Sequence, residues 1–403
     1  MSIITLIIFG LVYFGMIVGN LPGLAIDRAG VALLGAILFI SFSQQPLSEA
    51  IQYVDLSTIG ILFSFMVISA QFYFSGFYTH LVQKLICWHL TPSQLLFAII
   101  FTSGLLSSVL LNDIVCLALT PLMIQACRKK SLNPHPYLLG LACSANIGSS
   151  LTLIGNPQNV LIGEALNIRF GQYMKFSSVP CLLGLFFTWG LLHLQFKKQW
   201  HSKEASIEIE AMQYNSWQSL KGMLIICVLI LSFFFAPLPR DHLSLIAAGC
   251  ILLSRRISSY KTLNFIDWQL LVLFIGLFIV SKGFLQNNDL EQVLRFLQNA
   301  NIDMQSPVWM FILSIFLSNT LSNVPAVMLL LPFTHSQSMG SLLAITSTLA
   351  GNMLIIGSIA NIIVISQALN HGVKISWRKH LKTGLPLTLI TLLISALWLF
   401  ILS

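Results

Sequence analysis

Charged residues are scarce in this chain of 403 residues, where Asp, Glu, Lys and Arg together make up 8% against 56% hydrophobic residues. The mean hydropathy is +0.85. Soluble domains carry about 25% charged residues, so the composition excludes a water-soluble domain and indicates a polytopic membrane protein. The net charge of +8 does not predict nucleic acid binding, because the 21 Lys and Arg lie in short connectors between apolar runs.

Metal-binding and redox motifs are also missing. The seven cysteines show no CxxC spacing, and the nine histidines form neither HExxH nor an i, i+4 pair. A zinc site or a membrane metalloprotease therefore has no support, and no cofactor is expected. No Lys or Arg precedes Arg28, so residues 2–19 lack the basic region of a cleaved signal peptide and are expected to be a retained span.

What the chain does contain is an internal duplication. The phrase IGNPQNVLIGEALN at 154–167 resembles IGSIANIIVISQALN at 356–370, so that Asn159 recurs 202 positions later as Asn361. Earlier in each half, Asn112 has a proline nine residues on, and Asn323 repeats this pattern at an offset of 211. These polar phrases interrupt hydrophobic segments, where no water is at hand for unsatisfied groups, and such interruptions usually mark a transport site.

A bilayer crossing takes about 20 helical residues. Ordinary spans are expected at 2–19, 29–43, 58–77, 174–195, 218–236, 242–254, 268–283 and 380–402. The segments 137–166 and 340–369 are too long for one crossing and carry Gly and Asn past the middle, which favours a helix broken into two halves over a long tilted helix. The segments 93–127 and 308–332 are polar in the middle, which favours a re-entrant hairpin of two half-helices.

With the hairpins counted as no net crossing, each half has five crossings, and the second half must enter the membrane inverted. The predicted fold is an all-α polytopic membrane protein with two inverted repeats, at 1–197 and 217–403, joined by a linker at 198–216. This topology puts 16 Lys and Arg on one side and five on the other. By the positive-inside rule the 16 are cytoplasmic, which predicts an inner membrane protein with both termini outside.

Inverted repeats of this kind build a binding site near the midplane, where helix N-termini attract anions and free carbonyls coordinate cations. Asparagine suits such tips because it both donates and accepts hydrogen bonds. The predicted site is centred on four asparagines that correspond between the halves, with further polar residues nearby: Asn112, Asn323, Asn159 and Asn361, then Asn146, Asn156, Ser318, Asn319, Thr320, Asn352 and Ser358.

Asp113 is the acidic residue that breaks the correspondence, because its partner in the second half is Val324. A lone carboxylate at membrane depth is suited to bind a proton or a sodium ion. The alternative is an aspartate that caps the N-terminus of a half-helix, and both roles are compatible. Glu164 is expected at the membrane interface, near the end of its half-helix.

The phrases LLNDIVCLALTP (110–121), NIGSSLTLIGNPQN (146–159), SNTLSNVPAVMLLLP (318–332) and GNMLIIGSIANIIV (351–364) resemble the ion transporter superfamily, in its branch of arsenite permeases, sodium/proton antiporters and citrate-transporter-like proteins. The resemblance implies an elevator-type secondary transporter that forms a homodimer. Carried over by position, it adds further site residues: Thr152, Gly155, Pro157, Ser322 and Gly357.

The first predicted tip departs from the dicarboxylate branch. That branch resembles Ser-Asn-Thr at both tips, whereas here only 318–320 has this sequence and the first tip contains Asn112-Asp113. The departure argues against a sodium/dicarboxylate symporter. The second tip has Ser322-Asn323 where the arsenite-type branch tends to have two asparagines, which argues against a specific assignment to arsenite.

The function predicted from these features is ion-coupled secondary transport of a small inorganic or carboxylic anion, or exchange of a monovalent cation for protons. The coupling ion is a proton or sodium, which would bind transiently at the hairpin tips. A channel is an alternative, because re-entrant loops also line pores. An intramembrane enzyme using Asp113 would need a second catalytic group at the same depth, and a scaffold would need a sizeable soluble domain, neither of which the sequence shows.

Overall fold

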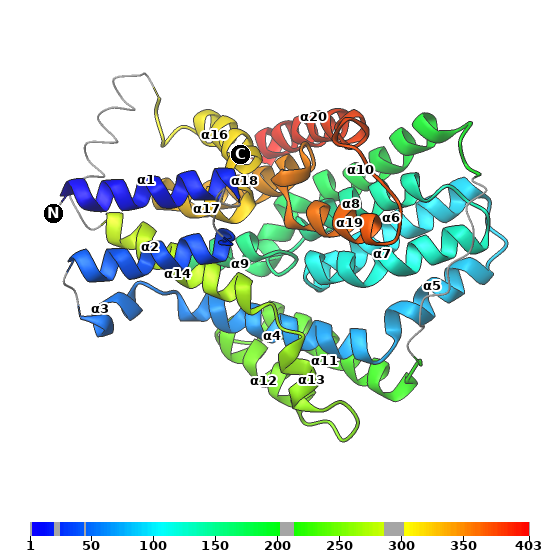
Figure 1. Ribbon diagram of the computed structural model, residues 1–403, viewed down its shortest axis with the longest axis horizontal. Helices are drawn as coiled ribbons and strands as arrows, with labels where there is room; N and C mark the ends of the chain where they lie inside the picture. The colour runs from blue at the N-terminus through cyan, green and yellow to red at the C-terminus, as the bar shows by residue number, and fades with distance from the viewer. Residues whose placement is uncertain (1, 20–24, 44–45, 202–212, 286–301, 403) are drawn as a thin grey trace.

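The computed structural model describes residues 2–19, 25–43, 46–201, 213–285 and 302–402 (Figure 1). These residues form α-helices and two short 3-10 helices, and no β-strand occurs among them. Six of the described helices are long and apolar enough to cross a bilayer, and shorter apolar helices accompany them. The all-helical membrane fold expected from composition is confirmed.

Corresponding helices follow one another in the same order along the two halves of the chain. The described helices before residue 200 are α1 (Ser2–Val18), α2 (Arg28–Ser43), α3 (Leu47–Gln52), α4 (Leu56–Phe74), α5 (Phe77–Cys87), α6 (Pro92–Val109), α7 (Asn112–Lys129), α8 (Pro134–Ser149), α9 (Pro157–Ala165) and α10 (Phe170–Phe196). Those after it are α11 (Ser216–Phe235), α12 (Arg240–Leu252), α13 (Ser259–Asn264), α14 (Trp268–Leu285), α16 (Pro307–Leu321), α17 (Asn323–Leu330), η1 (Leu331–Phe333), α18 (Gln337–Ala350), η2 (Ile355–Gly357), α19 (Ile359–Asn370) and α20 (Trp377–Leu402).

Even the six-residue helices α3 and α13 recur at matching places, directly before α4 and α14. This order supports the duplication, while the inversion of the second half stays a prediction. Most of the predicted linker, at 202–212, lies outside the described residues, as does 286–301 in the second half.

The halves are interleaved rather than separate. Helix α2 packs along α14, and its counterpart α12 packs along α4, which is the counterpart of α14. We call the helices α1, α2, α4, α11, α12 and α14 the framework. The remaining long helices form a second group, in which α6 packs on α8, α16 on α18, and α10 on α20. Figure 1 shows α1, α2 and α14 together at one end and α6, α7 and α8 at the other, with α4 running between them.

Both long segments are broken, as expected. Helix α8 ends at Ser149 and α9 begins at Pro157, capped by the side chain of Asn156. Helix α18 ends at Ala350 and α19 begins at Ile359 after a short 3-10 turn. A continuous tilted helix is therefore wrong for both segments.

The two arms of the first predicted hairpin, α6 and α7, extend over residues 92–129, one or two residues beyond the expected segment 93–127 at each end. Helices α6 and α7 have 18 residues each, about 27 Å at 1.5 Å per residue, and only two residues separate them. A capping box at Thr91 extends α6 at its start, and α7 continues past the apolar run to Lys129. In the second half, α16 and α17 are shorter, at 15 and 8 residues.

Helices α6 and α8 approach closely because glycines face each other. A Cβ on Gly148 would collide with the backbone of Gly104, which cannot turn aside. Every residue of α8 except His135 is buried, so this crossing lies at the centre of the second helix group.

We therefore expect Gly148→Ala to force α6 and α8 apart and to lower the free energy of unfolding by about 1–3 kcal/mol. The measurement is the thermal unfolding midpoint of the detergent-purified protein. Gly190→Ala in α10 is the matched control, because a Cβ there meets nothing within 4 Å. If the two variants unfolded at the same temperature, the close approach of α6 and α8 would not contribute to stability.

Candidate functional site

Four helix N-termini converge on one small cavity of about 20 Å³. Its lining comes from the first residues of α7, α9, α17 and α19 and the positions just before them: Asn112, Asp113, Pro157, Gln158, Ser322, Asn323, Val324, Ser358 and Ile359. Both predicted tips and both helix breaks are thus brought together. A helix N-terminus carries roughly half a positive charge, so four of them make the cavity attractive to negative charge.

Asp113 supplies the negative charge in this cavity. It lies in the first turn of α7, but it is not the cap, because Leu111 occupies the N-cap position and no side-chain capping bond is made there. Among the described residues, no hydrogen-bond donor or cation contacts its carboxylate. Asp113 therefore does not cap α7 by a hydrogen bond. Its negative charge still lies at the N-terminus of α7, where it interacts favourably with the positive end of the helix dipole.

Asn146 links the two halves. Its Nδ2 donates to Oδ1 of Asn352 (2.9 Å) and Oδ1 of Asn361 (3.3 Å), while its Oδ1 accepts from Oγ of Ser358 (2.7 Å) and Nδ2 of Asn112 (3.2 Å). The side chain is fully buried. All four partners belong to the predicted site, and three of them come from the second half of the chain.

The two break asparagines make the same hydrogen bonds in both halves. Nδ2 of Asn159 donates to the carbonyl oxygens of Ser149 and Thr152, at 3.3 and 3.0 Å. Nδ2 of Asn361 donates to the carbonyl oxygens of Gly351 and Leu354, at 2.9 and 3.3 Å. Each acceptor pair is offset by 202 residues, as the asparagines are. The carbonyls freed by the end of a helix are thus satisfied by one amide in each break.

Two contacts between the halves also match under this offset. Nδ2 of Asn156 donates to Oγ1 of Thr348 (3.1 Å), and Oγ of Ser358 donates to Oδ1 of Asn146 (2.7 Å). Ser358 corresponds to Asn156 and Thr348 to Asn146. A reciprocal pair of this kind is what a two-fold axis between the breaks produces.

The second tip is strained and tightly held. Ser322, between α16 and α17, has φ 77° and ψ 161°, a region that only glycine adopts easily, at a cost of about 1–3 kcal/mol. Turned so that its nitrogen faces carbonyls, the amide of Asn323 donates to Ser347 O (3.0 Å) and Gly357 O (2.9 Å) and accepts from Nε2 of Gln158 (3.2 Å). Such strain persists at sites where the surrounding contacts hold it.

Four buried oxygen atoms at the tips have no hydrogen-bond partner among the described residues: Oγ of Ser107, Oγ of Ser318, Oδ1 of Asn112 and Oδ1 of Asn319. The two serines correspond at an offset of 211. Hydroxyl and amide oxygens are ligands for sodium-like hard cations. No group of three His, Cys, Asp or Glu that could hold a metal ion occurs in the described part of the chain.

Six of the 17 predicted site residues line the cavity and the other eleven do not, Thr320 and Thr152 among them. Thr320 donates to carbonyls of its own helix, at Phe316 and Leu317, and Thr152 donates to the carbonyl of Ser108. Gly155 and Gly357 offer carbonyls to the asparagines of the facing tips, since Asn112 N donates to Gly155 O at 3.1 Å.

Several participants were missed by sequence reasoning. Thr348 and Ser107 could have been found from the offsets, because they correspond to Asn146 and Ser318. Tyr173, which accepts from Asn159 at 3.0 Å, and His380, whose Nε2 lies 3.1 Å from the carbonyl oxygen of Asn352, carry no signal in the sequence.

A polar cavity between helix breaks inside an apolar helical protein defines a membrane transporter. Residues 4–341 match the citrate transporter family, and the chain belongs to that family of secondary transporters. The resemblance to the ion transporter superfamily is thereby confirmed.

Relatives agree with this membership. A Dictyostelium discoideum transporter that carries the name arsB is 25% identical, covering 92% of this chain and 87% of the relative. The silicon efflux transporter LSI3 of Oryza sativa subsp. japonica is 25% identical, covering 95% of this chain and 94% of the relative. The inner membrane protein YbiR of Escherichia coli K12 is 29% identical, covering 92% of this chain and 93% of the relative. The YdaH transporter of Alcanivorax borkumensis, described as having an unusual topology, shares the fold with a TM-score of 0.57 and 14% identity, covering 99% of this chain and 97% of that structure.

We expect Asn146→Ala to remove all four links of the central network. Leaving buried amides without partners should lower the free energy of unfolding by about 2–4 kcal/mol and abolish transport. Thermal unfolding and flux in proteoliposomes are the measurements. Asn264→Ala, at an exposed position in α13, is the control and should behave as wild type. A variant at position 146 with wild-type stability would contradict the central role of this amide.

Proposed function

We propose that the protein is a proton-coupled carrier that binds its cargo in the cavity between the two tips and the two breaks, with Asp113 as the proton-binding group. The observation that carries this proposal is the convergence of four helix N-termini around a single carboxylate. Among the described residues, no Lys, Arg or His lines the cavity, so the helix ends are its source of positive potential.

With Asp113 in the cavity, the charge of the cargo determines whether the proton is transported in the same direction as the cargo or in the opposite one. Protonation of Asp113 removes a negative charge from the cavity, so an anion then binds more tightly, and by reciprocity the anion strengthens proton binding. An anion and a proton therefore cross together. A cation competes with the proton for the carboxylate, so the two cross in opposite directions. Measurement of proton direction thus identifies the class of cargo.

The cargo we propose is a small oxyacid or its anion, inorganic or carboxylic. The family name, the silicon transporter and the arsB-named relative support this class. The cavity of about 20 Å³ holds a species no larger than water, so a cargo of citrate size requires the tips to separate. Amide and hydroxyl groups from both tips are suited to bind the hydroxyls of such an acid.

Exchange of a monovalent cation for protons is the second candidate. The four oxygen atoms without partners at Ser107, Ser318, Asn112 and Asn319 favour it, because they offer neutral ligands at the two tips, one of which carries Asp113. Sodium bound there would also serve as a coupling ion.

The movement we propose is an elevator-type displacement of the tip-bearing helices against the framework. The interleaved packing of α2 on α14 and α12 on α4 supports this division, because it fastens the framework helices to one another across the halves. We further propose two inverted repeats, a homodimer, and an inner membrane location with both termini outside.

Asp113→Asn tests the proton-binding role. We expect loss of cargo-linked proton movement by at least about tenfold and a residual flux that no longer changes with pH, because an amide does not titrate. The measurement is a pH-sensitive dye in proteoliposomes, with arsenite, silicic acid, citrate, sodium, lithium and potassium added in turn. A flux that saturates with cargo concentration separates a carrier from a channel.

The control is Asp303→Asn, an exposed carboxylate before α16 that should leave flux unchanged. Asn323→Ala provides a second test within the cavity and should also stop flux. Wild-type rates in both Asp113→Asn and Asn323→Ala would overturn the assignment of the site.

A further inference from the structure

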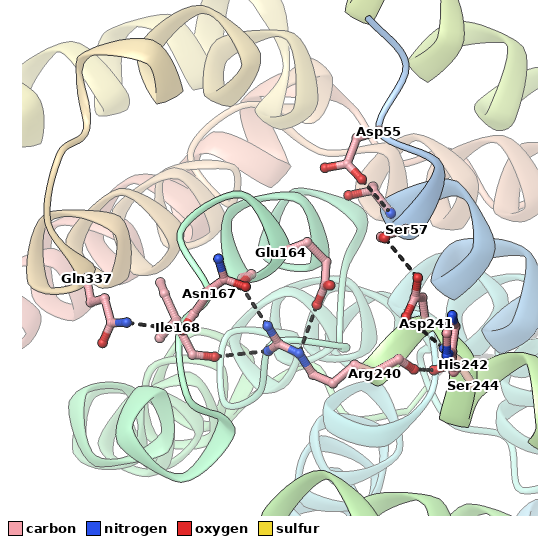
Figure 2. A network of polar contacts seen from close by, with 12 residues as sticks. Asp55, Ser57, Glu164, Asn167, Ile168, Arg240, Asp241, His242, Ser244 and Gln337 are labelled. Atoms are coloured by element: carbon pink, nitrogen blue, oxygen red, sulfur yellow. Dashed lines mark hydrogen bonds and ion pairs between the residues drawn. The ribbon is translucent and has the colours of Figure 1, made fainter. Parts of the chain in front are cut away.

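Arg240 reaches from the start of α12 to the end of α9 and engages it with all three guanidinium nitrogens (Figure 2). Its Nε lies 2.8 Å from Oε1 of Glu164. Its other two nitrogens donate to backbone carbonyls, Nη1 to Ile168 at 3.0 Å and Nη2 to Gly163 at 2.8 Å. A planar fork that meets three acceptors at once holds orientation as well as position.

The end of α9 is shaped to receive this side chain. Asn167 adopts a left-handed conformation (φ 49°) that turns the chain after Ala165, and Ile168 N donates back to Gly163 O at 3.0 Å. The carbonyl groups at the helix end are therefore gathered in one place, where a cation interacts favourably with the C-terminal dipole. The side chains of Arg240 and Glu164 are 16% and 15% exposed, so water weakens this contact less than it weakens a surface ion pair.

On its other side, Arg240 belongs to the framework. The next residue, Asp241, accepts a hydrogen bond from Oγ of Ser57 at 2.8 Å, which ties the start of α12 to the start of α4. Helices α4 and α12 also pack along each other. Figure 2 shows Ser57 and Asp241 near the backbone end of Arg240, whereas Glu164 lies at its guanidinium end. The contact therefore joins the framework to a helix whose opposite end lines the cargo cavity.

We propose that Arg240 is a positioning residue that anchors α9 to the α4–α12 pair, and that its three-point contact breaks and re-forms in each transport cycle. This inference rests on the proposed function, because α9 carries cavity residues and must move with the cargo while α12 stays. In the described conformation the contact is closed, so the structure represents the anchored end of that movement.

Cross-linking distinguishes a contact that must break from one that is merely structural. In a background with the exposed Cys87, Cys227 and Cys250 replaced by Ser, the pair Glu164→Cys and Arg240→Cys is joined by a reducible bifunctional maleimide long enough to span the lost arginine side chain. We expect flux to fall by at least about tenfold on cross-linking and to return on reduction. Full flux in completely cross-linked protein would overturn the proposal.

The matched control is the pair Ser57→Cys and Asp241→Cys, treated with the same reagent. This pair lies within the framework, so its cross-link should leave flux unchanged. Loss of flux in both pairs would mean that any cross-link at this end stops the protein, and the proposal would fail.

Hydrogen exchange tests the anchoring separately from transport. We expect Arg240→Gln to speed amide exchange at 163–168 at least about tenfold, and Glu164→Gln to do so less, because that variant keeps both carbonyl bonds. If amide exchange at 163–168 were unchanged in Arg240→Gln, the proposed anchoring of α9 would be wrong, whatever flux this variant showed. If the wild-type protein transported none of the cargoes tested, the proposed function would be wrong. The exchange measurement would still show whether Arg240 anchors α9.

Discussion

The constraint on which this structure depends is that a helix interrupted inside a membrane has no water to satisfy its open ends. In this protein, asparagine side chains supply the hydrogen bonds that these open helix ends require. Asn159 and Asn361 each place one amide nitrogen between two carbonyls of a break, and Asn156 caps the helix that follows the first break. Because these bonds fix the breaks, the N-termini of α9 and α19 hold a constant direction, and the cavity exists where they meet the tips.

The bonds that hold the breaks are shared by the two halves, but the chemistry of the cavity is not. Asp113 corresponds to Val324, and Asn146 corresponds to Thr348. The two-fold arrangement therefore serves to build the site, whereas the charge and the central four-bonded amide come from one half alone. A symmetric cavity with two carboxylates would place like charges together and favour neutralisation of one, whereas a single acidic residue is suited to the proton-binding role we propose for Asp113.

The sequence was sufficient for the helical class, the two breaks and most of the site, because duplication and polar residues in apolar runs are local signals. Asn112, Asn159, Asn323 and Asn361 could be placed by spacing alone. The links between halves could not, since the pairing of Asn146 with Asn352 and Asn361 depends on how α8 meets α18 and α19. The bounds of α6 and α7 differ from the predicted segment by only one or two residues, because the cap at Thr91 and the last turn at Lys129 lie just outside the apolar run. The sequence predicts only an interfacial position for Glu164, and nothing in its spacing from Arg240 indicates that the two touch.

Helix α9 connects these observations. It has nine residues, about 14 Å in length, which is too short to bend appreciably between its ends. Its N-terminus lies at the cavity with Gln158, and its C-terminus lies against Arg240. In the movement we propose, a displacement of the end of α9 at the cavity must therefore appear at its far end as a change in the guanidinium contact. The energy of that contact would then add to the stability of one conformation only, and its strength would set the populations of the two proposed end states.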